Sequence, residues 1–138
     1  MDRKFDEKDA QVELERRYKE ATVILQDQDK LERFLQRLEK KLRVIPKAGD
    51  TLAIIPSLVS LVRNYAKKEY SEIPIGSIVA IISALIYVLS PIDIIPDVIP
   101  GAGYIDDALV IATCMKLVKA DVDEYLEWRK SSGRDLIV

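Results

Sequence analysis

The apolar and polar residues of this 138-residue chain follow the period of an α-helix along most of its length. Two amphipathic helices are predicted in the first 43 residues, separated by the polar stretch QDQD. Asp29 is a candidate N-cap of the second helix, with Glu32 three residues later as in a capping box. The two apolar stripes are narrow, so we expect these helices to pack on the rest of the chain or against a second copy. The stripes consist of Leu14, Tyr18, Ala21 and Leu25, and then Leu31, Phe34, Leu35, Leu38, Leu42 and Ile45.

Two later segments have the same amphipathic pattern. One covers residues 50–68 and contains Pro56, which is expected to kink or restart the helix. The other is expected to begin around Tyr104 and to end at residues 128–130, with Gly133 as a stop signal. No segment shows sustained alternation of apolar and polar residues. The predicted fold is therefore all-α, a compact bundle of about five helices with a Pro/Gly/Asp-rich loop between the last two.

Residues 73–92 contain no charged side chain. Proline and glycine near both ends limit the continuous helix to about residues 75–89, roughly 22 Å at 1.5 Å per residue. A membrane span needs about 30 Å, so the pattern favours a central core helix surrounded by the others. A membrane-inserted or membrane-lying segment is the alternative, because the basic cluster RLEKKLRVIPK (residues 37–47) lies upstream. Glu39 interrupts that cluster, which favours a solvated helix face.

Composition excludes several classes of function. The net charge is −2 and the pI is near 5.3, which argues against nucleic-acid binding. The chain has no histidine and one cysteine, Cys114, so zinc chemistry, Ser-His-Asp or Cys-His catalysis and an internal disulfide cannot be built within it. No cofactor is predicted. The first ten residues are too charged for a signal peptide, so we expect a cytoplasmic protein, either free or attached to or inserted in the inner membrane.

The uneven distribution of charge predicts two regions. More than half of the charged residues lie in the first 43 positions. We therefore expect a charged amphipathic helical region at residues 1–46 and a more apolar helical domain at residues 47–138. The N-terminal helices are the expected interface for self-association or for a protein partner.

The stretch SPIDIIPDVIPGAGYIDD (residues 90–107) has turn and cap residues in positions that suit a corner between two helices. Ser90 can cap a helix, Pro91 suits its first position, and Asp93 falls at the third, where a carboxylate reaches free amides. Pro96 ends that turn. The glycines that follow, including Gly103, are expected to form a tight passage.

Four carboxylates and no cation occur in this stretch. Asp106 and Asp107 are expected in the first turn of the last helix, where its dipole favours negative charge. Alternatively, Asp93, Asp97, Asp106 and Asp107 converge, and then a cation or a partner's Lys or Arg must relieve their repulsion. Oxygen ligands suit Mg²⁺, Mn²⁺ or Ca²⁺. The spacing leaves both interpretations open.

The string YVLSPIDIIPDVIPGAGYIDD resembles the signature of the YkvA family, a bacterial and archaeal domain of unknown function. The resemblance extends over residues 67–118. It implies association with a membrane, as inferred for the family from hydropathy, and it brings no activity, cofactor or catalytic residue. The matching positions are Tyr87, Ser90, Pro91, Asp93, Pro96, Asp97, Gly103, Tyr104, Asp106 and Asp107.

Two functions from different classes are consistent with these observations. The favoured one is a non-enzymatic helical module that associates with a protein or a membrane surface. The other is a divalent-cation-binding domain or a metal-dependent hydrolase that uses the four aspartates, with Tyr87 or Tyr104 as polar helpers.

Overall fold

The computed structural model describes residues 6–42, 53–89 and 102–131, with side chains in the last range from residue 109 onward. Within these ranges the chain forms six helices and no strand, which confirms the all-α prediction. The helices are α1 (Glu7–Arg16), α2 (Tyr18–Leu25), α3 (Gln28–Leu42), α5 (Ile55–Ala66), α6 (Ile75–Leu89) and α7 (Ala102–Ser131).

A break at Arg17 accounts for the sixth helix, where about five were expected. Arg17 has φ −101° and ψ 1°, outside the helical region, and it separates α1 from α2. Its guanidinium donates to the carboxylate of Glu13 at 2.6 Å and to the backbone oxygen of Glu13 at 3.0 Å. The expected first helix is therefore divided into two.

Aspartates cap the N-terminal ends of α1 and α3. Asp6 and Asp9 form a reciprocal capping box at α1. At α3, Oδ1 of Asp27 accepts from the backbone N–H groups of Asp29 at 3.0 Å and Lys30 at 3.2 Å. The prediction that Asp29 caps this helix was wrong by two residues, because Asp27 already satisfies the free amides there.

Pro56 lies at the start of α5, and most of the residues that would form a preceding helix lie outside the described part of the chain. α5 begins at Ile55 with Pro56 in its first turn, where the missing N–H of proline costs no hydrogen bond. α7 begins at Ala102, two residues before the expected start. The loop predicted between the last two helices lies mainly at residues 90–101, outside the described residues.

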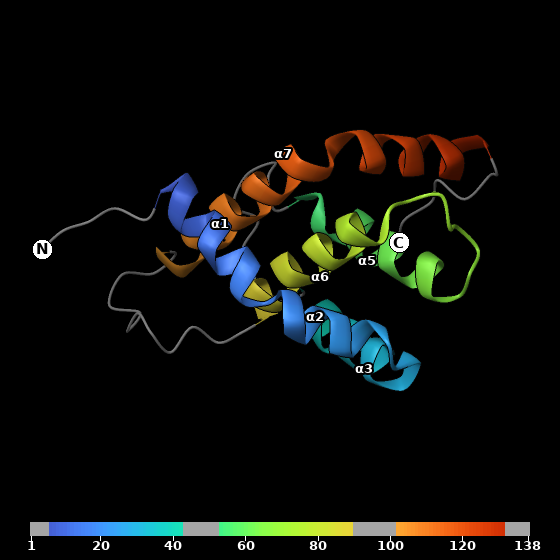
Figure 1. Ribbon diagram of the computed structural model, residues 1–138, viewed down its shortest axis with the longest axis horizontal. Coiled ribbons are helices and arrows are strands. Elements are labelled where there is room, and N and C mark those ends of the chain that lie inside the picture. The colour runs from blue at the N-terminus through green and yellow to red at the C-terminus, as the bar shows by residue number, and fades with distance from the viewer. Residues whose placement is uncertain (1–5, 43–52, 90–101, 132–138) are drawn as a thin grey trace, which may run out of the picture.

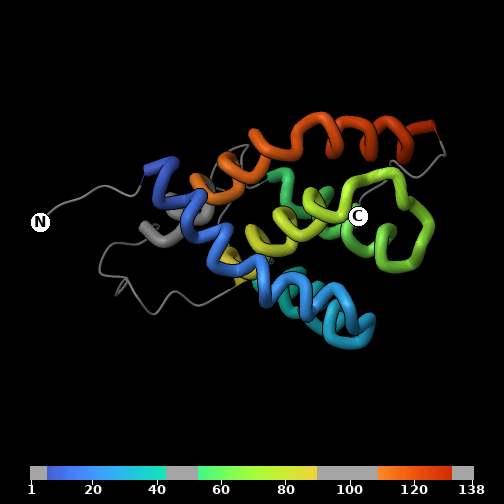
Figure 2. The backbone as a smooth tube through the Cα atoms, in the orientation of Figure 1, coloured from blue at the N-terminus to red at the C-terminus, as the bar shows by residue number. Residues whose placement is uncertain are grey.

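α6 is the central helix of the bundle. It contacts each of the five other helices described, with α7 along one side and α1 and α2 along another (Figure 1). The tube view gives the same arrangement, with the start of α6 leading inward from the green turn after α5 (Figure 2). The prediction of a core helix is confirmed, because ten of its residues are buried. These are Ile78, Ala80, Ile81, Ile82, Ser83, Ala84, Leu85, Ile86, Tyr87 and Val88.

Across the ranges that the structure describes, no helix is both long enough and apolar enough to cross a bilayer.

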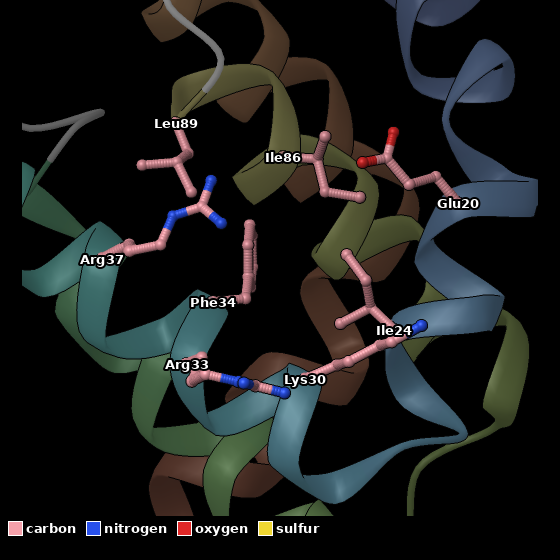
Figure 3. Close-up of a pocket in the computed structure, with 8 residues that line it drawn as sticks. All are labelled: Glu20, Ile24, Lys30, Arg33, Phe34, Arg37, Ile86 and Leu89. Atoms are coloured by element: carbon pink, nitrogen blue, oxygen red, sulfur yellow. The ribbon is translucent and has the colours of Figure 1, made fainter.

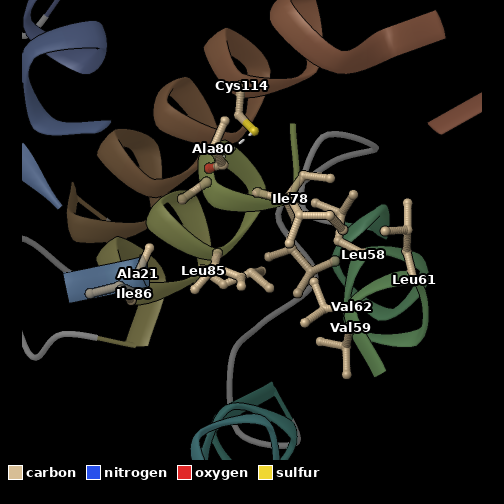
Figure 4. Packing of buried hydrophobic residues seen from close by; sticks show 14 of the residues in the cluster. Ala21, Leu58, Val59, Leu61, Val62, Ile78, Ala80, Leu85, Ile86 and Cys114 are labelled. Carbon is tan, nitrogen blue, oxygen red and sulfur yellow. Dashed lines mark hydrogen bonds between the residues drawn. The ribbon is translucent and has the colours of Figure 1, made fainter. Parts of the chain in front are cut away.

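The core joins α5, α6 and α7 through close apolar contacts (Figure 4). Leu58 and Val62 of α5 are fully buried, as are Ile78 and Leu85 of α6. On the other side of α6, the Cys114 thiol of α7 lies 3.6 Å from the backbone oxygen of Ala80. Burial raises the pKa of Cys114 to about 12, so this thiol is neutral and packs as a small apolar group.

The N-terminal helices share this core. Leu14 and Ala21 are fully buried, and Leu31, Leu35 and Leu38 of α3 are at most 1% exposed. Their apolar stripes therefore pack on the rest of the chain, which is one of the two arrangements expected from the sequence. The predicted domain boundary at residues 46 and 47 lies outside the described residues.

Candidate functional site

The residues singled out in the sequence motif fall mostly outside the described part of the chain. Ser90, Pro91, Asp93, Pro96 and Asp97 lie in residues 90–101. The convergence of the four aspartates therefore stays a prediction. Among the side chains that the structure describes, no group of three or more His, Cys, Asp or Glu residues is placed to hold a metal ion.

The backbone of α7 corrects two expectations about the end of the motif. Gly103 lies within α7 and not in a tight turn, since the helix begins at Ala102. Asp106 and Asp107 consequently fall in the second turn of the helix, not in its first. The helix dipole stabilises negative charge mainly within the first turn. It therefore explains the presence of aspartate at these two positions less well than expected.

Tyr87 is the motif residue whose side chain the structure describes. It lies near the end of α6 and is 5% exposed. The guanidinium of Arg17 lies over its ring, in the geometry of a cation–π contact. Tyr87 thus contributes to packing between α6 and the junction of α1 and α2.

α3 separates its charged side chains onto two flanks of its buried apolar stripe. Residues three, four or seven positions apart share a face of a helix. Glu32 and Glu39, seven apart, lie on the flank beside α5. Lys30, Arg33 and Arg37, at steps of three and four, lie on the opposite flank beside α2 and α6. We call this second flank the basic face of α3.

Arg63 of α5 binds both glutamates of the acidic flank. Its Nε and Nη2 donate to the two carboxylate oxygens of Glu32 at 3.1 and 2.9 Å. Its Nη1 and Nη2 donate to those of Glu39, both at 3.0 Å. The hydrogen bonds from Arg63 lower the pKa of Glu32. Glu39 therefore does not interrupt the basic face, although it interrupts the basic cluster in the sequence.

A groove of about 500 Å³ opens between α2, α3 and α6, next to the basic face (Figure 3). Phe34 and Ile86 are 5% and 4% exposed and form its floor. Arg37 reaches inward between Phe34 and Leu89, while Glu20 lies on the opposite rim (Figure 3). The lining residues are Glu20 and Ile24 of α2, Lys30, Arg33, Phe34 and Arg37 of α3, and Ile86 and Leu89 of α6.

The three cations of the groove have no carboxylate partner, unlike five other cations that the structure describes. Arg16, Arg17, Arg63, Lys116 and Lys119 all form ion pairs with carboxylates. Within the described residues, neither Lys30 nor Arg33 nor Arg37 forms one. Their charges are therefore available to an anion that enters from solvent.

Lys41 fastens α3 to the end of α6. Its ammonium donates to the backbone oxygen of Val88, one residue before α6 ends. A cation at this end also complements the negative pole of the helix dipole. The contact fixes the position of α3 against the wall of the groove that Ile86 and Leu89 provide.

Comparison with known proteins identifies the family. A family model described as "Protein of unknown function (DUF1232)" matches residues 77–113. The chain is also 33% identical over 75 residues to "Uncharacterized membrane protein YkvA" of Bacillus subtilis (strain 168), an alignment that covers 54% of this chain and 71% of that protein. The chain belongs to the YkvA family. No solved structure matches it significantly.

The match to the family model includes only part of the groove. It runs from α6 into α7, so it contains Ile86 and Leu89 but none of the groove's three cations. The basic face lies on α3, which is outside the residues that the family model matches. The groove therefore combines Ile86 and Leu89 of the matched region with charged and apolar residues from outside it.

Sequence reasoning missed this site because it considered the charges of residues 1–43 as an interleaved series. One signal could have found it. Lys30, Arg33 and Arg37 follow the same steps of three and four as the apolar stripe, and the acids at those steps from them, Asp27 and Asp29, lie only at the N-terminal end of α3. On a helical wheel, Glu32 and Glu39 fall on a different face from these three cations, although acidic and basic residues alternate in the linear sequence.

Proposed function

We propose that this YkvA-family chain is a non-enzymatic helical module that associates with the surface of anionic membranes. The observation that carries the proposal is the basic face of α3, whose three cations have no carboxylate partner in the described part of the chain. Lysine and arginine near an anionic leaflet each contribute about 1 kcal/mol of attraction. The name of the Bacillus subtilis relative, a membrane protein, agrees with such a location.

Two further observations support binding at the surface. The chain's net charge is −2, so the three cations of the basic face form a positive patch on a molecule that is negative overall. The most apolar helix, α6, is buried among the others and is engaged in holding the fold. Attachment through the outer face of α3 needs no rearrangement of this core. The cytoplasmic leaflet, which carries anionic lipid, is the proposed side of attachment.

A protein partner or a second copy is the other proposed kind of contact for the N-terminal helices. Their apolar stripes are buried in this chain's own core, so the outer, charged faces of α1, α2 and α3 remain for it. Membrane association is preferred because the basic face adjoins an apolar groove, and a lipid offers both an anion and a chain.

Vesicle flotation tests the proposal. The full chain is floated with phosphatidylcholine vesicles, with or without phosphatidylglycerol, at low and high salt. We expect binding that requires phosphatidylglycerol and weakens with salt, and that is lost in the triple variant Lys30→Gln, Arg33→Gln, Arg37→Gln. The matched control is Lys8→Gln, Lys119→Gln, Lys130→Gln, which removes the same charge from exposed positions on α1 and α7. Equal loss in both variants, or no binding by the native chain, contradicts the proposal.

A further inference from the structure

The groove between α2, α3 and α6 has the size and form of a small-molecule site. Its volume of about 500 Å³ lies within the range of roughly 300–1,000 Å³ that is common for ligand pockets. Three helices define it, and Lys41 anchors α3 to α6 at one end. Electrostatic binding to a membrane would need only a flat basic surface. The groove is therefore evidence for a ligand site that is independent of the charge.

The groove's polar groups suit a phosphate. Arginine presents paired donors that match phosphate oxygens, and lysine adds a mobile point charge. Arg33 and Arg37 lie on the same wall as Lys30, all exposed, with no carboxylate partner among the described residues. Glu20 on the opposite rim is the one acid among the lining residues, and it opposes an anion.

The groove's floor suits a hydrocarbon. Phe34 and Ile86 are nearly buried, while Ile24 and Leu89 are partly exposed at its sides. A free phosphate would leave these apolar groups in water. An anion that continues into methylene groups would satisfy the cations and cover the floor at the same time.

We infer that this groove binds the headgroup of a single anionic phospholipid, with its phosphate at the basic face and the first methylenes of its chains against Phe34 and Ile86. The inference rests on the proposed membrane association and makes it more specific. The volume holds a headgroup and the start of the chains, so the remaining chain length stays in the bilayer.

The test uses short-chain phosphatidylglycerol below its micelle concentration and the methyl NMR signals of the full chain. We expect saturable shifts of Ile24, Ile86 and Leu89, the three lining residues that carry methyl groups. Glycerol phosphate tests the anion alone, and short-chain phosphatidylcholine tests the chain with a zwitterionic headgroup. Equal shifts with glycerol phosphate overturn the lipid assignment, and equal shifts with phosphatidylcholine overturn the role of the cations.

Two single substitutions of exposed rim residues should move the affinity in opposite directions. Arg37→Gln is expected to weaken binding of short-chain phosphatidylglycerol about tenfold, the effect of one lost charge-assisted hydrogen bond. Glu20→Gln is expected to strengthen it by a factor of about two to five, because a repelling charge is removed. Circular dichroism verifies that both variants remain folded. The same direction of change in both overturns the assignment.

The failure of this inference can be distinguished from the failure of the proposed function. Vesicle binding without shifts of the three methyl groups overturns the groove as a lipid site and leaves surface association intact. The absence of both vesicle binding and shifts overturns both.

Discussion

The guanidinium carbon of Arg17 lies 4.9 Å from the centroid of the Tyr87 ring. Arg17 is the residue that breaks the N-terminal helix into α1 and α2, and Tyr87 belongs to the family signature at the end of α6. The two residues are 70 positions apart in the sequence. The contact therefore links the N-terminal helices to α6, most of which lies in the region that the family model matches.

Arg17→Gln should lower the free energy of unfolding by about 1–2 kcal/mol, since it removes a partly desolvated cation–π contact and the pairing with Glu13. Urea unfolding measures this change. Arg16→Gln is the matched control, because Arg16 also pairs with Glu13 but its side chain is 67% exposed against 18% for Arg17. A change within about 0.5 kcal/mol is expected for the control. Equal effects of the two substitutions would show that the contact with Tyr87 contributes nothing.

The contribution of Arg63 to stability should depend on pH. Arg63 lowers the pKa of Glu32 below its ordinary value of 4.5, so the unfolded chain takes up a proton at Glu32 before the folded chain does. The contribution is therefore fully present above pH 4.5 and declines as the pH falls through the lower folded pKa. Urea unfolding of the native chain and of Arg63→Met should give a difference that shrinks on acidification. Arg33→Met, which has no carboxylate partner among the described residues, should show no such trend.

Lys68 occupies a backbone conformation that favours glycine. It follows the C-cap of α5 with φ 61°, and the next two amides bond back to the oxygen of Asn64. Lys68→Gly should raise the free energy of unfolding by about 0.5–1 kcal/mol, as measured by urea unfolding. Lys67→Gly, one residue earlier at φ −84°, should lower it instead. Destabilisation by both substitutions would contradict the expected relief of strain.

Val23 provides a separate test of the proposed membrane face. It lies on the outside of α2, three residues after Glu20 of the groove rim, and is 48% exposed. Val23→Asp places a negative charge beside the anionic surface and should weaken vesicle binding about fivefold, equivalent to about 1 kcal/mol. Val12→Asp is the control, because Val12 is 50% exposed on α1, which does not line the groove. An equal reduction by both would place the membrane contact elsewhere.

The elements of the fold could be predicted well because each has a local cause. The apolar run of α6 indicated a core helix, and Pro56 indicated a kink or a new helix start. The core helix and a helix start at Pro56 are both present. The break at Arg17 could not be predicted. The stripe from Leu14 to Leu25 continues through it, and the contacts of Arg17 with Glu13 and Tyr87 exist only in the folded chain.

The candidate site could be predicted from the sequence less well than the fold. Charged and turn-forming residues are conspicuous around the aspartates of residues 93–107, and the arrangement of these aspartates stays a prediction. The groove depends on side chains of α2, α3 and α6, which are separated by up to 69 positions from Glu20 to Leu89. No local pattern indicates that Phe34 and Ile86 form one floor.

The sequence by itself determined that this chain is helical, that α6 is its most buried helix, and that it carries the YkvA signature. These properties follow from periodicity, composition and short-range order, which neighbouring residues encode. Only the tertiary structure decided that Glu39 turns toward Arg63 while Lys30, Arg33 and Arg37 turn toward α6. The reason is physical: a helix has one orientation once its apolar stripe is buried, and that orientation assigns each charge to a partner or to solvent.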